Sequence, residues 1–263
     1  MHFIRRAVLT VAAVCIAVPA FIATPAAAQD APIFDQVPAV MYETYRGVNN
    51  PAFNDYFAML VEKYGGTGGH PWAIYRENAK VAYRITVLPE GMPSMLPIQQ
   101  ARVESFQEFD QAQMDMWNAG WGSRHVSIWN TAPAMSVVPD RFTVDDIRAL
   151  PYNRVVVYHL KWNQAGAFRE ALRARSALDR EAGIEGLVQT AWNGGIGTNA
   201  QVVMVRYSSE SELALLESRG ARMEARAAYR EEWQAHNRAM NDAAYRIERH
   251  DQRRINDLSY SGN

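Results

Sequence analysis

The sequence predicts an α+β fold made of two tandem βαββαβ units, and three observations support this prediction. The chain has 263 residues, of which 48% are hydrophobic, so it can form one large domain or two small ones. After an N-terminal export signal, the same order of strand and helix patterns occurs twice. Phe53 and Phe168 lie at matching positions in the first predicted helix of each half.

Residues 1–28 have the pattern of a bacterial signal peptide. Arg5 and a second arginine precede an apolar stretch over residues 7–22, and small residues lead up to Ala28. The apolar stretch is shorter than the roughly 20 residues that span a bilayer, which argues against the alternative of a membrane anchor. We therefore expect a Sec-type signal, a flexible leader over residues 29–38, and a periplasmic or secreted mature protein.

The composition excludes several classes of function. Cys15 is the only cysteine and lies in the signal, so the mature chain has no disulfide, thiol nucleophile or cysteine-ligated metal. The formal net charge is −1, and cleavage of the signal removes two arginines and no acid. No strong positive field would then attract nucleic acid or anionic lipid. We expect neither nucleic acid nor, after cleavage, a membrane as a partner.

The first predicted unit covers residues 39–131. Its opening strand, residues 40–46, is rich in aromatic and β-branched residues. Asn50 and Pro51 suit the start of a helix, in which Phe53 and other apolar residues recur at helical spacing. The further predicted elements are strands over 72–76 and 81–88, one long helix over 99–118, and a closing strand over 125–129.

The second predicted unit covers residues 154–263 and follows a proline-containing linker over residues 132–153. Its predicted elements are a strand over 154–162, a helix over 165–181, strands over 186–192 and 201–207, a helix over 210–240 with a break at Gly220, and a final strand over 244–249. Each half therefore has the order strand, helix, strand, strand, helix, strand. This order is the ferredoxin-like one.

The first half resembles the dimeric α/β-barrel superfamily, and most closely its NipSnap-like members. The residues that carry the resemblance are Tyr42, Glu43, Pro51, Phe53 and Phe57. In that superfamily two ferredoxin-like units press their sheets together around a cavity. The resemblance implies that this chain builds both units itself, as a monomer that acts as a pseudo-dimer. Members include cofactor-free monooxygenases, haem-handling enzymes, dismutating enzymes and proteins without known activity, so the fold does not choose a function.

Strand alternation indicates which side chains would line a cavity between the two sheets. Glu43 and Tyr45 share one face of the opening strand, and His159 and Lys161 share one face of its counterpart. We expect these four on the cavity face, because the helix-packed face should be the more apolar one. Similar reasoning adds Tyr75, Arg84, Trp129 and His250. Such a lining suits a small amphipathic or aromatic ligand, and the alternative is a satisfied polar layer or a solvent-facing set.

Three functions remain open at this point. The first is a binding protein with a small amphipathic or aromatic ligand between the sheets, and for it no cofactor or metal is predicted. The second is a cofactor-free monooxygenase or a haem-handling enzyme. In that case His159 would be the proton acceptor or haem ligand, Tyr45 or Trp129 would pack the substrate, and Lys161 or Arg84 would stabilise an anion. The third is a structural or interaction protein without a catalytic site, which a filled interface between the sheets would favour.

Overall fold

A computed structural model describes residues 34, 36–64, 70–199 and 201–261. The predicted signal peptide lies outside the described residues, and so does most of the predicted leader. In the described part, no helix has both the length and the apolar character needed to cross a membrane.

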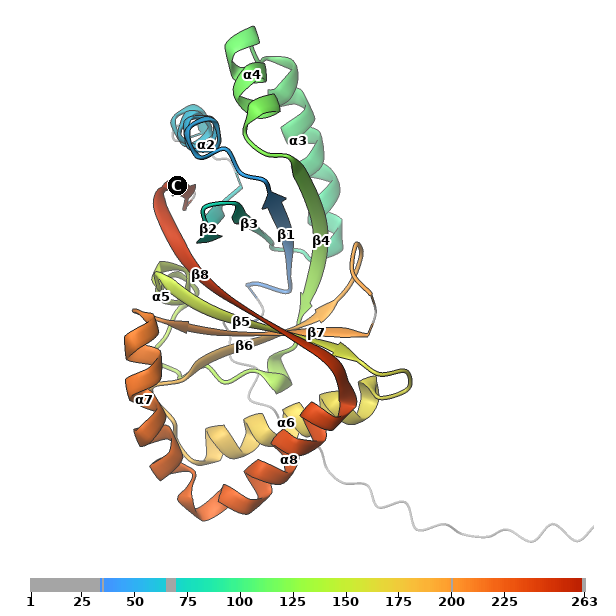
Figure 1. The fold of residues 1–263 in the computed structure, drawn as a ribbon, viewed down its shortest axis with the longest axis vertical. Helices are drawn as coiled ribbons and strands as arrows, with labels where there is room; N and C mark the ends of the chain where they lie inside the picture. Colours follow the sequence, from blue (N-terminus) through green and yellow to red (C-terminus); the bar gives the residue numbers. More distant parts are fainter. Residues whose placement is uncertain (1–33, 35, 65–69, 200, 262–263) are drawn as a thin grey trace, which may run out of the picture.

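Eight antiparallel strands close into one barrel in the order β1-β3-β2-β8-β5-β7-β6-β4 (Figure 1). The strands are β1 (Ala39–Arg46), β2 (Trp72–Asn78), β3 (Val81–Leu88), β4 (Ser123–Thr131), β5 (Tyr152–Leu160), β6 (Val188–Gly194), β7 (Val202–Ser209) and β8 (Ala244–Tyr260). The first four strands form a sheet in the order β2-β3-β1-β4, and the last four form a sheet in the corresponding order β6-β7-β5-β8. Pairing of β2 with β8 and of β4 with β6 joins the two sheets, so neither keeps a free edge.

Seven α-helices occur in the described residues. They are α2 (Asn50–Tyr64), α3 (Met95–Gln107), α4 (Gln111–Ala119), α5 (Val144–Ala149), α6 (Ala165–Glu181), α7 (Glu212–Ala225) and α8 (Arg230–Ala243), with short 3₁₀ helices η1 (Met92–Ser94), η2 (Pro133–Met135) and η3 (Ala227–Tyr229). Helices α2, α3 and α4 lie on one side of the barrel, and α6, α7 and α8 lie on the opposite side (Figure 1). The segment between β4 and β5 contains η2 and α5.

Two of the predicted helices differ from the structure in where they break. The single helix predicted over 99–118 is two helices, and Asp110 caps the second one. The Asp110 side chain accepts a hydrogen bond from the Gln113 backbone, and the Gln113 side chain accepts one from the Asp110 backbone, which is a capping box. In the second half, Gly220 lies inside α7, and the break falls instead between Arg226 and Tyr229. One glycine costs only about 1 kcal/mol in a helix, too little to end it.

Strand β8 is much longer than the strand predicted over 244–249. Its first part pairs with β5 and its last part pairs with β2, so this one strand belongs to both sheets. Figure 1 shows it crossing the whole molecule from α8 to the C-terminus. The sequence of this strand contains charged residues such as Arg253 and Arg254, so it lacks the apolar pattern by which a strand is predicted. The strand forms nevertheless, because its backbone pairs with β5 and β2, and backbone pairing does not require apolar side chains.

The barrel interior is filled by side chains. Tyr42, Tyr75, Tyr83, Trp129 and Trp192 are all buried there in one apolar cluster. A barrel of eight strands is just wide enough for its interior side chains to fill it. A small pocket beside Tyr75 and Trp192, which α5 also lines, has a volume of only about 70 Å³. Where a ligand cavity is predicted between the two sheets, the structure therefore has packed side chains.

The outer faces of the sheets pack against the helices in separate cores. Phe53 and Phe57 of α2 pack on the first sheet beside Tyr45, and both phenylalanines are fully buried. Phe168 and Leu172 of α6 pack in the same way on the second sheet. Two pockets lie on these outer faces, between sheet and helices.

Candidate functional site

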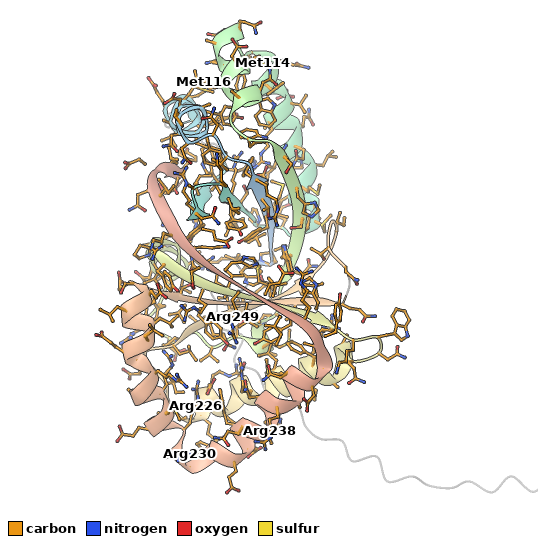
Figure 2. All side chains as sticks on the ribbon, in the orientation of Figure 1. Met114, Met116, Arg226, Arg230, Arg238 and Arg249 are labelled. Carbon is orange, nitrogen blue, oxygen red and sulfur yellow. The ribbon has the colours of Figure 1, made fainter. Side chains whose placement is uncertain are left out.

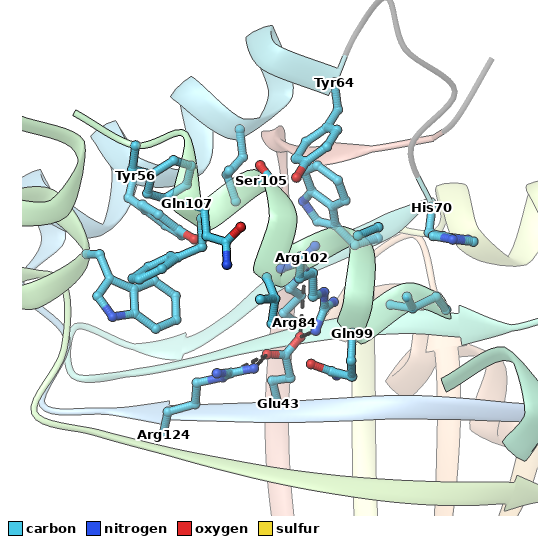
Figure 3. Close-up of a pocket in the computed structure, with 18 of the residues that line it drawn as sticks. Glu43, Tyr56, Tyr64, His70, Arg84, Gln99, Arg102, Ser105, Gln107 and Arg124 are labelled. Carbon is cyan, nitrogen blue, oxygen red and sulfur yellow. Dashed lines mark hydrogen bonds and ion pairs between the residues drawn. The ribbon is translucent and has the colours of Figure 1, made fainter. Parts of the chain in front are cut away.

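A pocket of about 460 Å³ lies between the outer face of the first sheet and helices α2, α3 and α4 (Figure 3). We call it the first pocket. Its walls are mostly aromatic or aliphatic, and the wall residues include Tyr56, Leu60, Tyr64, Trp72, Ile98, Phe106, Phe109 and Trp117. The volume and the apolar walls are typical of sites for small molecules.

The floor of the first pocket is a buried carboxylate surrounded by arginines. Glu43 of β1 is fully buried, and its Oε1 atom accepts hydrogen bonds from Arg124 of β4, at 2.8 Å from Nε and 2.5 Å from Nη2. The other oxygen, Oε2, lies 3.1 Å from Nη1 of Arg102 on α3 and 3.7 Å from Nε of Arg84 on β3. Figure 3 shows all three guanidinium groups converging on the one carboxylate.

Aromatic rings and a hydroxyl hold these arginines in place. The guanidinium of Arg84 lies 4.5 Å from the centre of the Trp72 ring, and that of Arg124 lies 5.6 Å from the Trp117 ring. Arg102 donates a hydrogen bond to Oγ1 of Thr86 at 3.0 Å. The floor is therefore ordered without a ligand, and three cationic groups surround a single anionic one.

Glu43 and Arg102 on the floor are both charged at neutral pH. Burial opposes ionisation of Glu43, but Arg102, Arg84 and Arg124 together outweigh it and lower the pKa of Glu43 to about 2. Burial and the neighbouring Arg84 lower the pKa of Arg102 to about 10, which still leaves it charged. Glu43 is thus a fixed anion rather than a proton acceptor near pH 7.

The floor also has hydrogen-bonding capacity that the protein does not use. In the described part of the chain, Nε of Arg84 and Oε2 of Glu43 are buried without a hydrogen-bond partner. A buried donor that stays unpaired costs about 1–3 kcal/mol.

The eight residues predicted for the site fall into three groups. Glu43, Tyr45 and Arg84 line the first pocket on the outer face of the first sheet. Tyr75, Trp129, His159 and His250 lie on strand faces that point to the barrel interior, and Lys161 lies in the loop after β5. The prediction that all eight share one cavity is wrong. It assumed that the helix-packed face is the more apolar one, whereas the closed barrel has an apolar interior as well.

Each predicted residue outside the first pocket makes a hydrogen bond or ion pair with another part of the protein. His159 lies 2.7 Å from Glu248 (Nε2 to Oε1), and His250 lies 3.2 Å from Glu77 and 3.3 Å from Glu248. Lys161 donates from Nζ to the carbonyl of Asp242 at 2.7 Å. The indole NH of Trp129 donates to Ser127 at 2.9 Å, and the hydroxyl of Tyr75 accepts from Arg206 at 3.2 Å.

These positions test the predicted role of His159 as a haem ligand. Its Nε2 atom is bonded to Glu248, and His159 lines neither the first pocket nor the pocket on the second sheet. The residues around it therefore do not fit a haem group. Within the described residues, no group of three His, Cys, Asp or Glu side chains comes together to hold a metal ion.

Sequence reasoning missed Arg102 and Arg124, which complete the floor. Arg124 lies opposite Tyr45 in the β1–β4 ladder, so the strand register would have suggested it. Arg102 lies on α3, and no spacing in the sequence indicates that this helix turns it toward Glu43. His70, at the start of the segment that enters β2, also lines the pocket.

No family model matches the chain, and no curated protein matches it in sequence. Solved structures do match it. A protein from Fusobacterium nucleatum aligns at 12% identity over 86% of this chain and 96% of its own, with a TM-score of 0.54. One from Lactobacillus acidophilus aligns at 10% identity over 85% and 96%, with a TM-score of 0.50. Both are named "putative monooxygenase". At these identities the likeness shows the fold alone, which is that of the dimeric α/β-barrel.

Proposed function

We propose that this chain is an exported binding protein that holds a small aromatic or amphipathic anion in the first pocket. In this proposal the two halves are tandem ferredoxin-like units that form a pseudo-dimer within a monomer. The NipSnap-like character of the first half and the periplasmic or secreted location remain part of the proposal. The observation that carries it is the floor of the first pocket, where three arginines surround one carboxylate beneath apolar walls.

The charge balance of the floor favours an anionic ligand. Glu43 compensates one of the three guanidinium groups, so the floor keeps an excess of positive charge. Charge interactions are stronger in a partly buried site than in water. The guanidinium groups of Arg84, Arg102 and Arg124 line the pocket, and guanidinium groups match a carboxylate or sulfonate.

The walls favour an aromatic or amphipathic body attached to that anion. Tyr56, Trp72 and Trp117 line the space above the floor. Aromatic rings contribute about 0.5–1.5 kcal/mol per pair beyond the burial of their area. A flat apolar ligand with one acidic group would match both walls and floor.

A cofactor-free oxygenase reaction is the second candidate, and the names of the two solved structures are what supports it. Such a reaction needs a group that accepts a proton from the substrate. Glu43 is poorly suited to that task, because its pKa of about 2 makes its carboxylate a weak base. Binding without turnover is therefore the better-supported function.

Titration with 1-naphthoate tests the proposal, with neutral 1-naphthamide as the matched ligand. Calorimetry should show saturable binding of the acid and binding about tenfold weaker for the amide, because the amide lacks the charge that the arginines attract. Ala101→Trp fills the pocket from α3 and should weaken binding at least about tenfold. Gln100→Trp adds the same side chain at an exposed neighbouring position outside the pocket, and should leave binding unchanged.

Two results would replace this proposal. No saturable binding of 1-naphthoate to the folded protein would leave the structural or interaction protein as the better interpretation, in line with the filled barrel interior. Oxygen consumption that requires an added aromatic acid and is lost in Ala101→Trp would favour the oxygenase.

A further inference from the structure

A second pocket, of about 510 Å³, lies between the outer face of the second sheet and helices α6, α7 and α8. Figure 2 shows Arg249 of β8 on the sheet side of this space, and Arg226 and Arg230 on the helix side. The second pocket and the first lie on opposite sides of the barrel, under different helices. Nothing in the function proposed above uses the second pocket.

Arginine dominates the lining of the second pocket. Seven arginines line it, and Asp179 is the single acidic lining residue in the described part of the chain. Two of the arginines are already neutralised. Arg226 lies 2.5 Å from Asp179, and Arg154 lies 2.8 Å from Asp251 and 3.0 Å from Glu212.

The other five arginines have no carboxylate partner among the described residues. They are Arg175, Arg219, Arg222, Arg230 and Arg249. So many like charges around one space repel each other, and burial together with the neighbouring Arg226 lowers the pKa of Arg222. A multiply charged anion in the pocket would remove this repulsion.

Arg175 shows that the charge is built into the site rather than spread over the surface. Its side chain is only 3% exposed, and it donates to three neutral acceptors, namely Asn237 at 3.1 Å, Gln189 at 3.1 Å and Tyr207 at 3.2 Å. Its Nε atom is buried and has no partner in the described structure. Burial disfavours the charge, but Tyr207, Tyr158 and Asp179 outweigh it and raise the pKa of Arg175, so this cation stays charged inside the pocket although no carboxylate of the described residues lies within ion-pair distance. A ligand that brings an anion up to it would form the ion pair that the protein does not supply.

The ring of Trp233 helps to orient the guanidinium groups of two arginines that line the pocket. The guanidinium of Arg226 lies 4.4 Å from its ring centre, and that of Arg175 lies 5.5 Å away. The indole NH of Trp233 donates to Asp179 at 2.9 Å. The arrangement is therefore ordered before a ligand arrives, which lowers the entropic cost of binding.

We propose that the second pocket binds a small multivalent oxyanion, a compound with at least two phosphate or carboxylate groups. The forked guanidinium donors match both kinds of group. Several separate arginines around a volume of this size select a compact ligand with more than one charge over a monovalent one.

Calorimetric titration with inorganic pyrophosphate and with citrate, at low ionic strength, tests this proposal. Saturable binding of at least one probe is expected, and the tighter probe identifies the phosphate or the carboxylate source. The double variant Arg230→Gln/Arg249→Gln changes two exposed lining residues and should raise the dissociation constant at least about tenfold. Arg238→Gln is the matched control, because Arg238 is an exposed arginine of α8 outside the pocket, and it should change binding less than about twofold.

Two outcomes would overturn the proposal. One is the absence of saturable heat with both probes while the protein is folded. The other is an equal loss of affinity in Arg238→Gln and in the double variant, which would indicate general attraction to a cationic surface. Circular dichroism of each variant shows that it remains folded, so a loss of binding is not confused with unfolding.

Discussion

Arg84 lies directly opposite Glu43 in the β1–β3 ladder, with its Nε atom 3.7 Å from the carboxylate. The pair is buried on the outer face of the first sheet, where both side chains form the floor of the first pocket. Cross-strand neighbours of opposite charge stabilise a sheet, but here two further arginines come from other elements. The carboxylate therefore holds β1, β3, β4 and α3 together.

Glu43→Gln should destabilise the fold strongly. The substitution leaves three buried or half-buried arginines without their anion, and removal of one partner from a buried ion pair costs about 3–5 kcal/mol. Glu108→Gln is the control, since Glu108 makes an exposed pair with Lys63 worth about 1 kcal/mol or less. Urea denaturation measures both free energies of unfolding, and similar values for the two variants would contradict the role given to Glu43.

The same carboxylate should make stability depend on pH in the acid range. The folded-state pKa of Glu43, about 2, lies below the ordinary value of 4.5. Its contribution is therefore fully present above about pH 4.5 and is lost as the pH falls through 2, with a size of about 3 kcal/mol. The difference in unfolding free energy between wild type and Glu43→Gln should shrink from pH 5 to pH 2. A constant difference over that range would show that the carboxylate is not preferentially ionised in the fold.

Much of the element order follows from local sequence. The aromatic run that begins at Val40 predicts the opening strand of the first half, and the structure has a strand there. The apolar spacing around Phe53 and Phe168 predicts the first helix of each half, and both helices are present. The barrel agrees with the resemblance to the dimeric α/β-barrel superfamily. Strand β8 could not be predicted at full length, because its pairing with two sheets leaves no apolar alternation to detect.

The candidate sites were harder to predict because they depend on contacts between distant elements. Alternation placed Glu43 and Tyr45 on one face correctly, but it could not decide which face was covered by helices. Both faces of a strand in a filled barrel are largely buried, so the apolar character of a face does not identify it. The role of Arg175 in the second pocket could not be predicted from the sequence. Only the folded chain shows that its hydrogen-bond partners are neutral side chains.

His159 should not bind haem. Its imidazole, near the end of β5, is bonded to Glu248 of β8, and His159 lines neither the first nor the second pocket. An absorption spectrum after addition of haem should show no Soret feature that depends on this residue, so wild type and His159→Ala should give the same spectrum. A Soret band that shifts in His159→Ala would restore the haem-handling enzyme as a candidate.

Trp129→Ala should show how much the filled barrel interior contributes to stability. Trp129 is buried among the aromatic side chains of the interior and bonds to Ser127, so its removal leaves a large cavity and should cost about 3–5 kcal/mol. Trp162 is the matched control, because it is 79% exposed in the loop after β5 and its replacement by alanine should change stability by about 0.5 kcal/mol or less. Thermal and urea unfolding of the two variants measure the difference. Equal stabilities would mean that the interior tolerates a cavity, and the space between the sheets would then again be a place for a ligand.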